Sequence, residues 1–314
     1  MKQKLFEAHY AGLWQSIEAS LGSDTPAADF PERYRALCHT LALARQRGYS
    51  PSLVARLSEL ALGAHRLLYG APEKRELVLM RWVRRDFPRL VRAEWRVVLL
   101  SLGVFLFTAA LVALAVYSNR DYAYSFSSAY ELSHYESMYR DGLERFGERK
   151  ADSDMLMFGF YIWNNVSICF RVFAGGVFFG LGSLLFVAFN GVHFGLIATW
   201  LTLNPETVNN FWSFVITHAA LELTGLILAG AAGLRLGLAI LKPGRLSRGA
   251  SLRAAAGRIL PMLLGAAIMT FLAAFIEAFW SSRADMPPLV KYMVGGLLWA
   301  AVLRYLLFAG RGES

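Results

Sequence analysis

Long apolar runs dominate the chain from residue 97 onward. A run of about 20 apolar residues can cross the hydrocarbon core of a bilayer as a helix. The runs at 97–117, 259–280 and 291–309 each fit one crossing, and residues 213–241 form a longer one. Counting the crossings predicts an all-α fold, a polytopic membrane helical bundle of about six spans.

The region between residues 155 and 203 predicts less regular spans. Residues 155–189 are apolar apart from a few polar positions, and as one helix they would measure about 50 Å, against a hydrocarbon core of roughly 30 Å. We therefore expect a break at Gly175–Gly176 and a turn at Asn190–Gly191. The segment 192–203 is short for an ordinary span. One or two of the six spans are thus expected to be broken or re-entrant.

The first 96 residues predict a separate soluble helical domain on the cytoplasmic side. Pro31 and Pro51 stand where helices begin, Gly48 and Gly70 stand where they end, and apolar residues recur between them at helical spacing. The expected domains are therefore 1–96, cytoplasmic and helical, and 97–310, transmembrane.

Charge is distributed by region along the chain. The formal net charge is +9, with basic residues gathered in 1–96 and in the loop 242–258, and acidic residues gathered in 118–155. The positive-inside rule then places both termini in the cytoplasm and makes 118–155 an extracytoplasmic amphipathic segment. No basic motif suggests nucleic acid, so membrane lipid is the expected partner.

The run at 213–241 contains ionisable residues. His218 and Glu222 are four residues apart and share one helix face with Gly225, Ala229 and Gly233. Small residues allow close helix packing, so this face is expected to contact protein. Glu277 in the fifth span is expected to face protein too, at a depth similar to that of His218.

Three interpretations of this polar group remain open. A carboxylate–imidazole network can join two helices structurally, and the same groups can form a proton or ion pathway. As a third possibility, His218, Glu222 and Glu277 form a legitimate ligand set for a divalent metal such as zinc, although His-x3-Glu is not the zinc-protease signature. Apart from such a metal, no cofactor is expected.

Further polar residues occupy the apolar region before this run. Amides inside a membrane bond across helices or satisfy the backbone at a helix break. The complete predicted intramembrane polar cluster comprises Asn164, Asn165, Arg171, Asn190, His193, His218, Glu222 and Glu277.

Enzyme fingerprints are absent from the sequence. It contains no serine elbow, no Walker motif and no paired cysteines, and its two cysteines, Cys38 and Cys169, are read as buried small residues. A non-enzymatic role is therefore favoured, and the faces of small residues favour a homo-oligomer.

At these residues the chain resembles the stage II sporulation protein M family of bacterial membrane proteins. The resemblance includes Asn164–Asn165, Asn190–Gly191, His218-x-x-x-Glu222, the glycine-rich stretch around Gly233, and Glu277, while Ala219 stands where the family is expected to have glycine. It covers about residues 95–310, and residues 1–96 look like the cytoplasmic extension of longer, non-sporulating members.

The resemblance implies a scaffold or envelope-complex subunit in the bacterial inner membrane, because the sporulation member anchors cell-wall hydrolases during engulfment. Cell-envelope proteins would then be partners, with the 118–155 segment as the contact surface. A channel or transporter that uses the His/Glu cluster is the alternative function. A metal-dependent membrane enzyme is the third.

Overall fold

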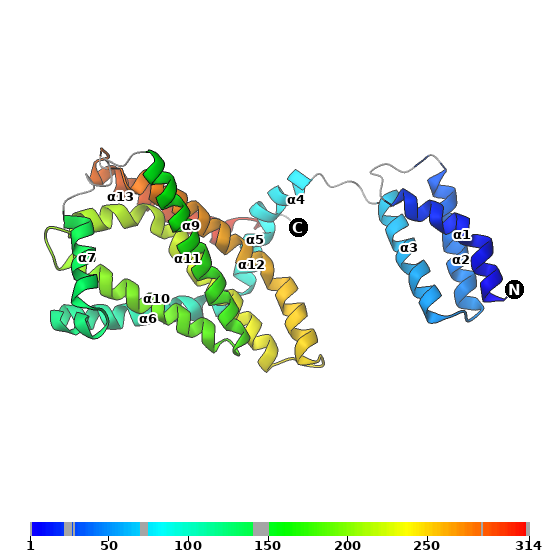
Figure 1. Ribbon diagram of the computed structural model, residues 1–314, viewed down its shortest axis with the longest axis horizontal. Coiled ribbons are helices and arrows are strands. Elements are labelled where there is room, and N and C mark those ends of the chain that lie inside the picture. The colour runs from blue at the N-terminus through cyan, green and yellow to red at the C-terminus, as the bar shows by residue number, and fades with distance from the viewer. Residues whose placement is uncertain are drawn as a thin grey trace. The chain divides into compact units, whose positions relative to one another are not determined.

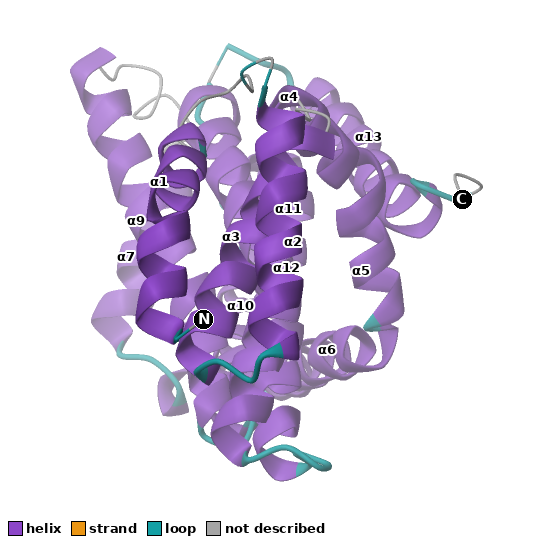
Figure 2. Cartoon of the chain, turned by 90° about the vertical axis from the view of Figure 1, so that its right-hand side faces the viewer, coloured by secondary structure: helices purple, strands orange, loops and turns teal. Residues whose placement is uncertain are grey.

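The computed structural model describes residues 2–21, 27, 29–69, 75–140, 151–283 and 285–311, and these residues form helices joined by turns and loops (Figure 2). The all-α prediction is confirmed, since the described residues contain no strand. The contacts divide the chain into two compact units, Met1–Val78 and Leu79–Ser314.

The first unit is a bundle of the helices α1 (Gln3–Ser20), α2 (Phe30–Gln46) and α3 (Pro51–Tyr69). Each helix contributes apolar side chains to one core, among them Phe6, Trp14, Leu37 and Leu57. The indole nitrogen Nε1 of Trp14 donates to Oγ1 of Thr40 at 3.3 Å, so these two buried polar groups are paired.

The second unit begins at Leu79, inside a short basic segment. This segment comprises α4 (Arg75–Arg81), a π-helical turn (Trp82–Asp86) and α5 (Phe87–Ala93). From Leu79 onward these residues pack with the second unit, so its boundary lies earlier than residue 97. The guanidinium of Arg92 donates to the carbonyl oxygens of Leu306 and Ala309, both at 2.8 Å. The segment therefore caps the C-terminal end of the last helix, where backbone acceptors lack helical partners.

Six helices of the second unit are long and apolar enough to cross a membrane, as predicted. They are α6 (Trp95–Ser118), α9 (Ala151–Ala174), α10 (Leu181–Thr202), α11 (Val208–Leu241), α12 (Arg248–Ile276) and α13 (Pro288–Phe308) (Figure 1). A shorter helix, α7 (Ala129–Arg140), lies between α6 and α9 in the sequence.

Helix α11 is the centre of this unit. It packs against α6, α9, α10, α12 and α13, and 72% of its most apolar window is buried, compared with 17% for α13. The stripe of small residues does contact protein: a Cβ on Gly225 would lie 2.5 Å from Cγ2 of Thr270 in α12. The opposite face is buried as well, since Ile227 and Leu234 belong to the same core.

The predicted break at Gly175–Gly176 is present. A 3-10 turn at Gly175–Val177 separates α9 from α10, and Phe179 and Gly180 both adopt positive φ angles. The turn is buried against α11, because a Cβ on Gly176 would lie 2.2 Å from the carbonyl oxygen of Gly233. Glycine is required at this contact because two backbones meet there.

The predicted turn at Asn190–Gly191 is wrong. Both residues lie inside α10, so 192–203 is the second half of a regular 22-residue helix and not a separate re-entrant segment. A Cβ on Gly191 would lie 2.2 Å from Oγ1 of Thr108 in α6. The glycine therefore serves helix packing, and the amide of Asn190 donates to the carbonyl of Phe186 one turn earlier.

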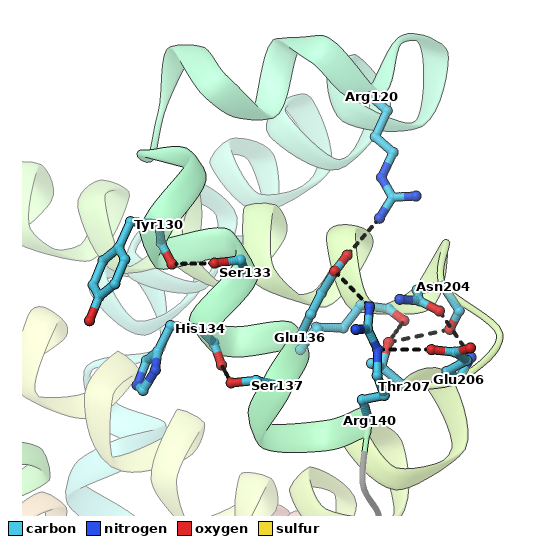
Figure 3. A network of polar contacts seen from close by, with 11 residues as sticks. Arg120, Tyr130, Ser133, His134, Glu136, Ser137, Arg140, Asn204, Glu206 and Thr207 are labelled. Atoms are coloured by element: carbon cyan, nitrogen blue, oxygen red, sulfur yellow. Dashed lines mark hydrogen bonds and ion pairs between the residues drawn. The ribbon is translucent and has the colours of Figure 1, made fainter.

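The expected amphipathic segment 118–155 is described in part. Residues 141–150 of this segment lie outside the described residues, but α7 buries Leu132 and Tyr139 against α10 and α11. A polar network fixes its end: Glu136 pairs with Arg120 at 2.8 Å, and Arg140 pairs with Glu206 at 2.8 Å (Figure 3). Helix α7 is thereby tied to the loop between α10 and α11.

Candidate functional site

Three ionisable side chains converge inside the second unit. His218 and Glu222 come from α11, and Glu277 comes from the π-helical turn (Glu277–Ser281) that ends α12. One ligand atom of each residue lies within 4.8 Å of the other two, and Nε2 of His218 lies 3.7 Å from Oε2 of Glu222. The structure thus places His218 and Glu277 at the same level of the bundle.

Helix geometry explains this convergence. The four-residue spacing stacks His218 above Glu222 on one face of α11. The close approach of α12 at Gly225 brings the two helices together next to this face. The π-helical turn then begins at Glu277, and π-helical turns are frequent at functional sites.

A chain of hydroxyl groups orients the imidazole of His218. Nδ1 of His218 lies 3.0 Å from Oγ of Ser281, which also contacts Oγ1 of Thr217. In the arrangement in which the Thr217 hydroxyl donates to the carbonyl of Phe214, at 3.2 Å, Ser281 donates to Thr217 and accepts from His218. In this arrangement the imidazole proton is on Nδ1, and the lone pair on Nε2 faces Glu222.

Asn165 of α9 completes the group. Its amide nitrogen lies 3.4 Å from Oε2 of Glu277, and its amide oxygen accepts a hydrogen bond of 3.0 Å from Asn164. The side chain is buried, so the amide presents its donor to the carboxylate from a fixed position. Three helices therefore contribute to one polar site.

The site forms one wall of a cavity of about 220 Å³. Asn190 and His193 of α10 line another part of this cavity, and Nε2 of His193 lies 3.5 Å from the hydroxyl of Tyr135 in α7. The cavity therefore reaches from the His/Glu group toward α7.

Aromatic side chains fill the space between α7 and His218. Tyr139 packs on Phe214 with ring centroids 6.0 Å apart, and Phe214 packs on His218 at 5.2 Å. Burial raises the pKa of Tyr139, and the nearby carboxylates of Glu277 and Glu222 raise it further. This aromatic column holds the α7 end of the site in place and keeps the Tyr139 hydroxyl neutral.

The predicted cluster of eight residues is thus only partly one site. Asn165, His218, Glu222 and Glu277 meet directly, and Asn190 and His193 share their cavity, although they lie inside α10 and not at a helix break. Asn164 acts through Asn165. Arg171 is exposed and bonds to the hydroxyl of Ser167 at 2.9 Å, away from the cavity.

Two residues of the site were missed in the sequence. Thr217 precedes the histidine directly, and its hydroxyl gave no signal because such a group also bonds to its own helix. Lys291 of α13 is fully buried and donates to the carbonyl of Ser281 at 2.9 Å. A lone lysine inside an apolar run was the available signal for it. Ser281 lies four residues after Glu277, which places both near one helix face, but its bond to His218 gave no signal in the sequence.

Comparison with known proteins supports a single family assignment for the membrane unit. The family model described as Stage II sporulation protein M matches residues 101–282, and a domain of unknown function matches residues 4–70. An uncharacterized protein of Methanocaldococcus jannaschii is 25% identical over 73 residues, which make up 23% of this chain and 41% of that relative. No solved structure matches the chain significantly.

Proposed function

The chain belongs to the stage II sporulation protein M family, and from this premise we propose that it is a membrane protein that binds a divalent cation between His218, Glu222 and Glu277. The observation that carries the proposal is the convergence of one nitrogen and two carboxylates within 4.8 Å. Zn²⁺ accepts this donor set. Three protein ligands leave the fourth coordination position open for water or another ligand.

Charge balance supports a divalent ion. Two carboxylates whose oxygens lie within 4.8 Å repel each other by roughly 3.5 kcal/mol at an effective dielectric constant of 20. The lone pair on Nε2 of His218 adds further electron density to the same space. A doubly charged cation cancels both carboxylate charges, whereas a proton cancels one of them.

The residues around the site have separate roles in this proposal. His218 supplies a neutral nitrogen donor whose orientation depends on Ser281. Glu222 and Glu277 supply charge, and Asn165 holds Glu277 by its amide. A bound cation of this class supplies positive charge and Lewis acidity at the cavity wall.

The size of the cavity favours ion binding over enzymatic turnover of an organic substrate. Its volume of about 220 Å³ is below the roughly 300–1,000 Å³ typical of small-molecule sites. The neighbouring His193 and Tyr135 extend the polar lining toward α7. We therefore propose that the cation enters from the α7 end, which the charge distribution assigns to the outside, and that the function is cation binding or transport.

Equilibrium dialysis of the purified full-length protein against Zn²⁺, followed by elemental analysis, tests the proposal. We expect about one ion per chain, with loss of this ion in His218→Gln and in the double variant Glu222→Gln, Glu277→Gln. His134→Gln in α7 and Glu59→Gln in α3 remove the same chemical groups from exposed positions and should bind like the wild type. Equal binding by all variants would overturn the proposal.

A scaffold for cell-envelope partners is a second candidate, favoured by the ordered segment at α7. The pairs of Arg120 with Glu136 and of Arg140 with Glu206 fix this segment (Figure 3), while the rings of Tyr122, Tyr124 and Tyr130 are exposed. Replacement of these tyrosines by serine should abolish cross-linking to a partner in cells and leave Zn²⁺ binding intact. Unchanged cross-linking would count against this surface.

A further inference from the structure

A second cavity lies at the opposite end of α11, where α6 and α12 begin. Its volume is about 710 Å³. On α11, Arg235 lies 13 residues beyond Glu222, which corresponds to about 20 Å along the helix axis. The cavity is therefore distinct from the His/Glu site and independent of the function proposed above.

A buried carboxylate organises the basic residues of this cavity. Glu94 is only 6% exposed, and its Oε2 lies 3.2 Å from Nε of Arg235 and its Oε1 2.9 Å from Nη2 of Arg258. These arginines come from α11 and α12, so one acid fixes two guanidinium groups at the cavity wall. A guanidinium has five N–H donors, and these pairs leave donors for another acceptor.

Two further basic side chains line the cavity, Arg96 at the start of α6 and Lys242 after the end of α11. Four basic groups and one carboxylate thus line the cavity, which leaves a positive surplus. An anion with several oxygen acceptors, such as a phosphate, fits this arrangement because arginine binds phosphate through paired N–H groups.

Apolar side chains form the rest of the lining. The wall includes Trp95, Val97, Leu238 and Leu246. Trp95 and Leu246 are each 53% exposed. The cavity lies where the spanning helix α6 begins and α11 ends, and we place the ends of spanning helices at the level of the lipid headgroups. A soluble phosphate compound would not require these exposed apolar groups, whereas a phospholipid presents acyl chains directly below its phosphate.

We propose that this cavity binds the phosphate of an anionic phospholipid, with Arg96, Arg235, Lys242 and Arg258 as the recognising residues and the apolar wall in contact with the upper acyl chains. Basic cavities between spanning helices are known sites for anionic headgroups. Glu94 is a positioning residue that keeps two of the arginines in place.

Native mass spectrometry of the full-length protein, with equal amounts of phosphatidylglycerol and phosphatidylcholine, tests this site. The informative variant is Arg96→Gln, Lys242→Gln, because neither residue pairs with Glu94. The matched control is Arg245→Gln, Arg253→Gln, which removes one basic group from the loop of Lys242 and one from α12, both outside the cavity. Unchanged Zn²⁺ binding, or an unchanged melting temperature if no Zn²⁺ binds, verifies that each variant is folded.

The wild type and the control should retain phosphatidylglycerol preferentially, and the cavity variant should bind it about tenfold or more weakly, since each basic group near the surface contributes about 1 kcal/mol. An equal loss in both variants would mean a general charge effect and would overturn the site. Displacement of the lipid by millimolar inorganic phosphate would assign the cavity to a soluble phosphate instead, and would overturn the lipid assignment.

Discussion

Oγ of Ser281 lies 3.0 Å from Nδ1 of His218, and the same hydroxyl contacts Thr217. When Ser281 donates to Thr217, its free lone pair accepts from Nδ1 of His218, and the imidazole proton is on that nitrogen. These two contacts also direct Nε2 toward Glu222, at 3.7 Å. A serine at the end of α12 therefore sets the chemistry of a histidine on α11.

Removal of this hydroxyl should weaken cation binding without removing a ligand. In Ser281→Ala, His218 loses the partner that fixes its tautomer, so Zn²⁺ affinity should fall by about 10- to 100-fold. Competition with a zinc-sensitive dye measures the change. Ser282→Ala is the matched control, because the hydroxyl of Ser282 donates to the carbonyl of Ala278 and not to the site. Equal affinities in both variants would contradict the role of Ser281.

Neutralising one carboxylate should stabilise the metal-free protein. With chelator present, Glu277→Gln removes the repulsion from Glu222 and can still accept a hydrogen bond from Asn165, so its melting temperature should exceed that of the wild type. Addition of Zn²⁺ at about 100 times its Kd should stabilise the wild type by about 2.7 kcal/mol. The variant should not respond. A lower melting temperature for the metal-free variant would contradict the unbalanced charge pair.

Helical periodicity explains why the centre of the site was predictable. Residues four apart, such as His218 and Glu222, share one face of a regular helix. The opposite directions of the two spans then predict that Glu277 lies at the same depth in the membrane as His218. Hydrogen bonds between side chains have no such period. Whether Ser281 meets His218 depends on the π-helical turn at 277–281, which sequence spacing does not reveal.

The turn predicted at Asn190–Gly191 was wrong for a related reason. This dipeptide is typical of turns in soluble proteins, but glycine in a membrane helix also allows close packing. Gly191 packs against Thr108 of α6, and that contact is visible only when the two helices are placed side by side. The domain boundary at residue 96 was drawn where the apolar runs begin, whereas the contacts group the basic segment from Leu79 with the membrane unit, and Arg92 bonds to the end of α13.

A methyl group at Gly176 should destabilise the membrane unit. Its Cβ would lie 2.2 Å from the carbonyl oxygen of Gly233, so α11 and the turn before α10 would have to separate. Overpacking of this kind costs typically about 1–3 kcal/mol. A thermal melt of the full chain in detergent measures the loss. Gly103→Ala is the control, since nothing lies within 4 Å of its added methyl group, and it should melt like the wild type.

The N-terminal unit should fold without the membrane unit. It has its own core, and residues 1–78 expressed alone should give a helical circular dichroism spectrum with a cooperative melt. Leu57→Ala should cost about 2–5 kcal/mol, because this side chain is completely buried. Leu62→Ala should change stability little, since Leu62 is 54% exposed. A non-cooperative melt of the wild-type fragment would contradict its independence.

The start of α7 should respond to pH through Glu131. The hydroxyl of Ser127 donates to its carboxylate at 2.7 Å. The backbone amide of Ser128 also donates to this carboxylate, and the backbone amide of Glu131 donates to the hydroxyl of Ser128, which together form a capping box. These bonds, led by that of Ser127, hold the pKa of Glu131 below its usual value. The carboxylate therefore stabilises the helix start above the ordinary carboxyl pKa, and this contribution is lost as pH falls through the lowered pKa.

Hydrogen exchange across residues 129–140 measures this effect. In Glu131→Gln the first turn of α7 should exchange faster than in the wild type at neutral pH, after correction for intrinsic rates. The difference should vanish in acid, where both side chains are neutral. Ser137→Ala, further along α7, should leave exchange in the first turn unchanged. A difference that persists in acid would show that Glu131 acts through its shape and not through its charge.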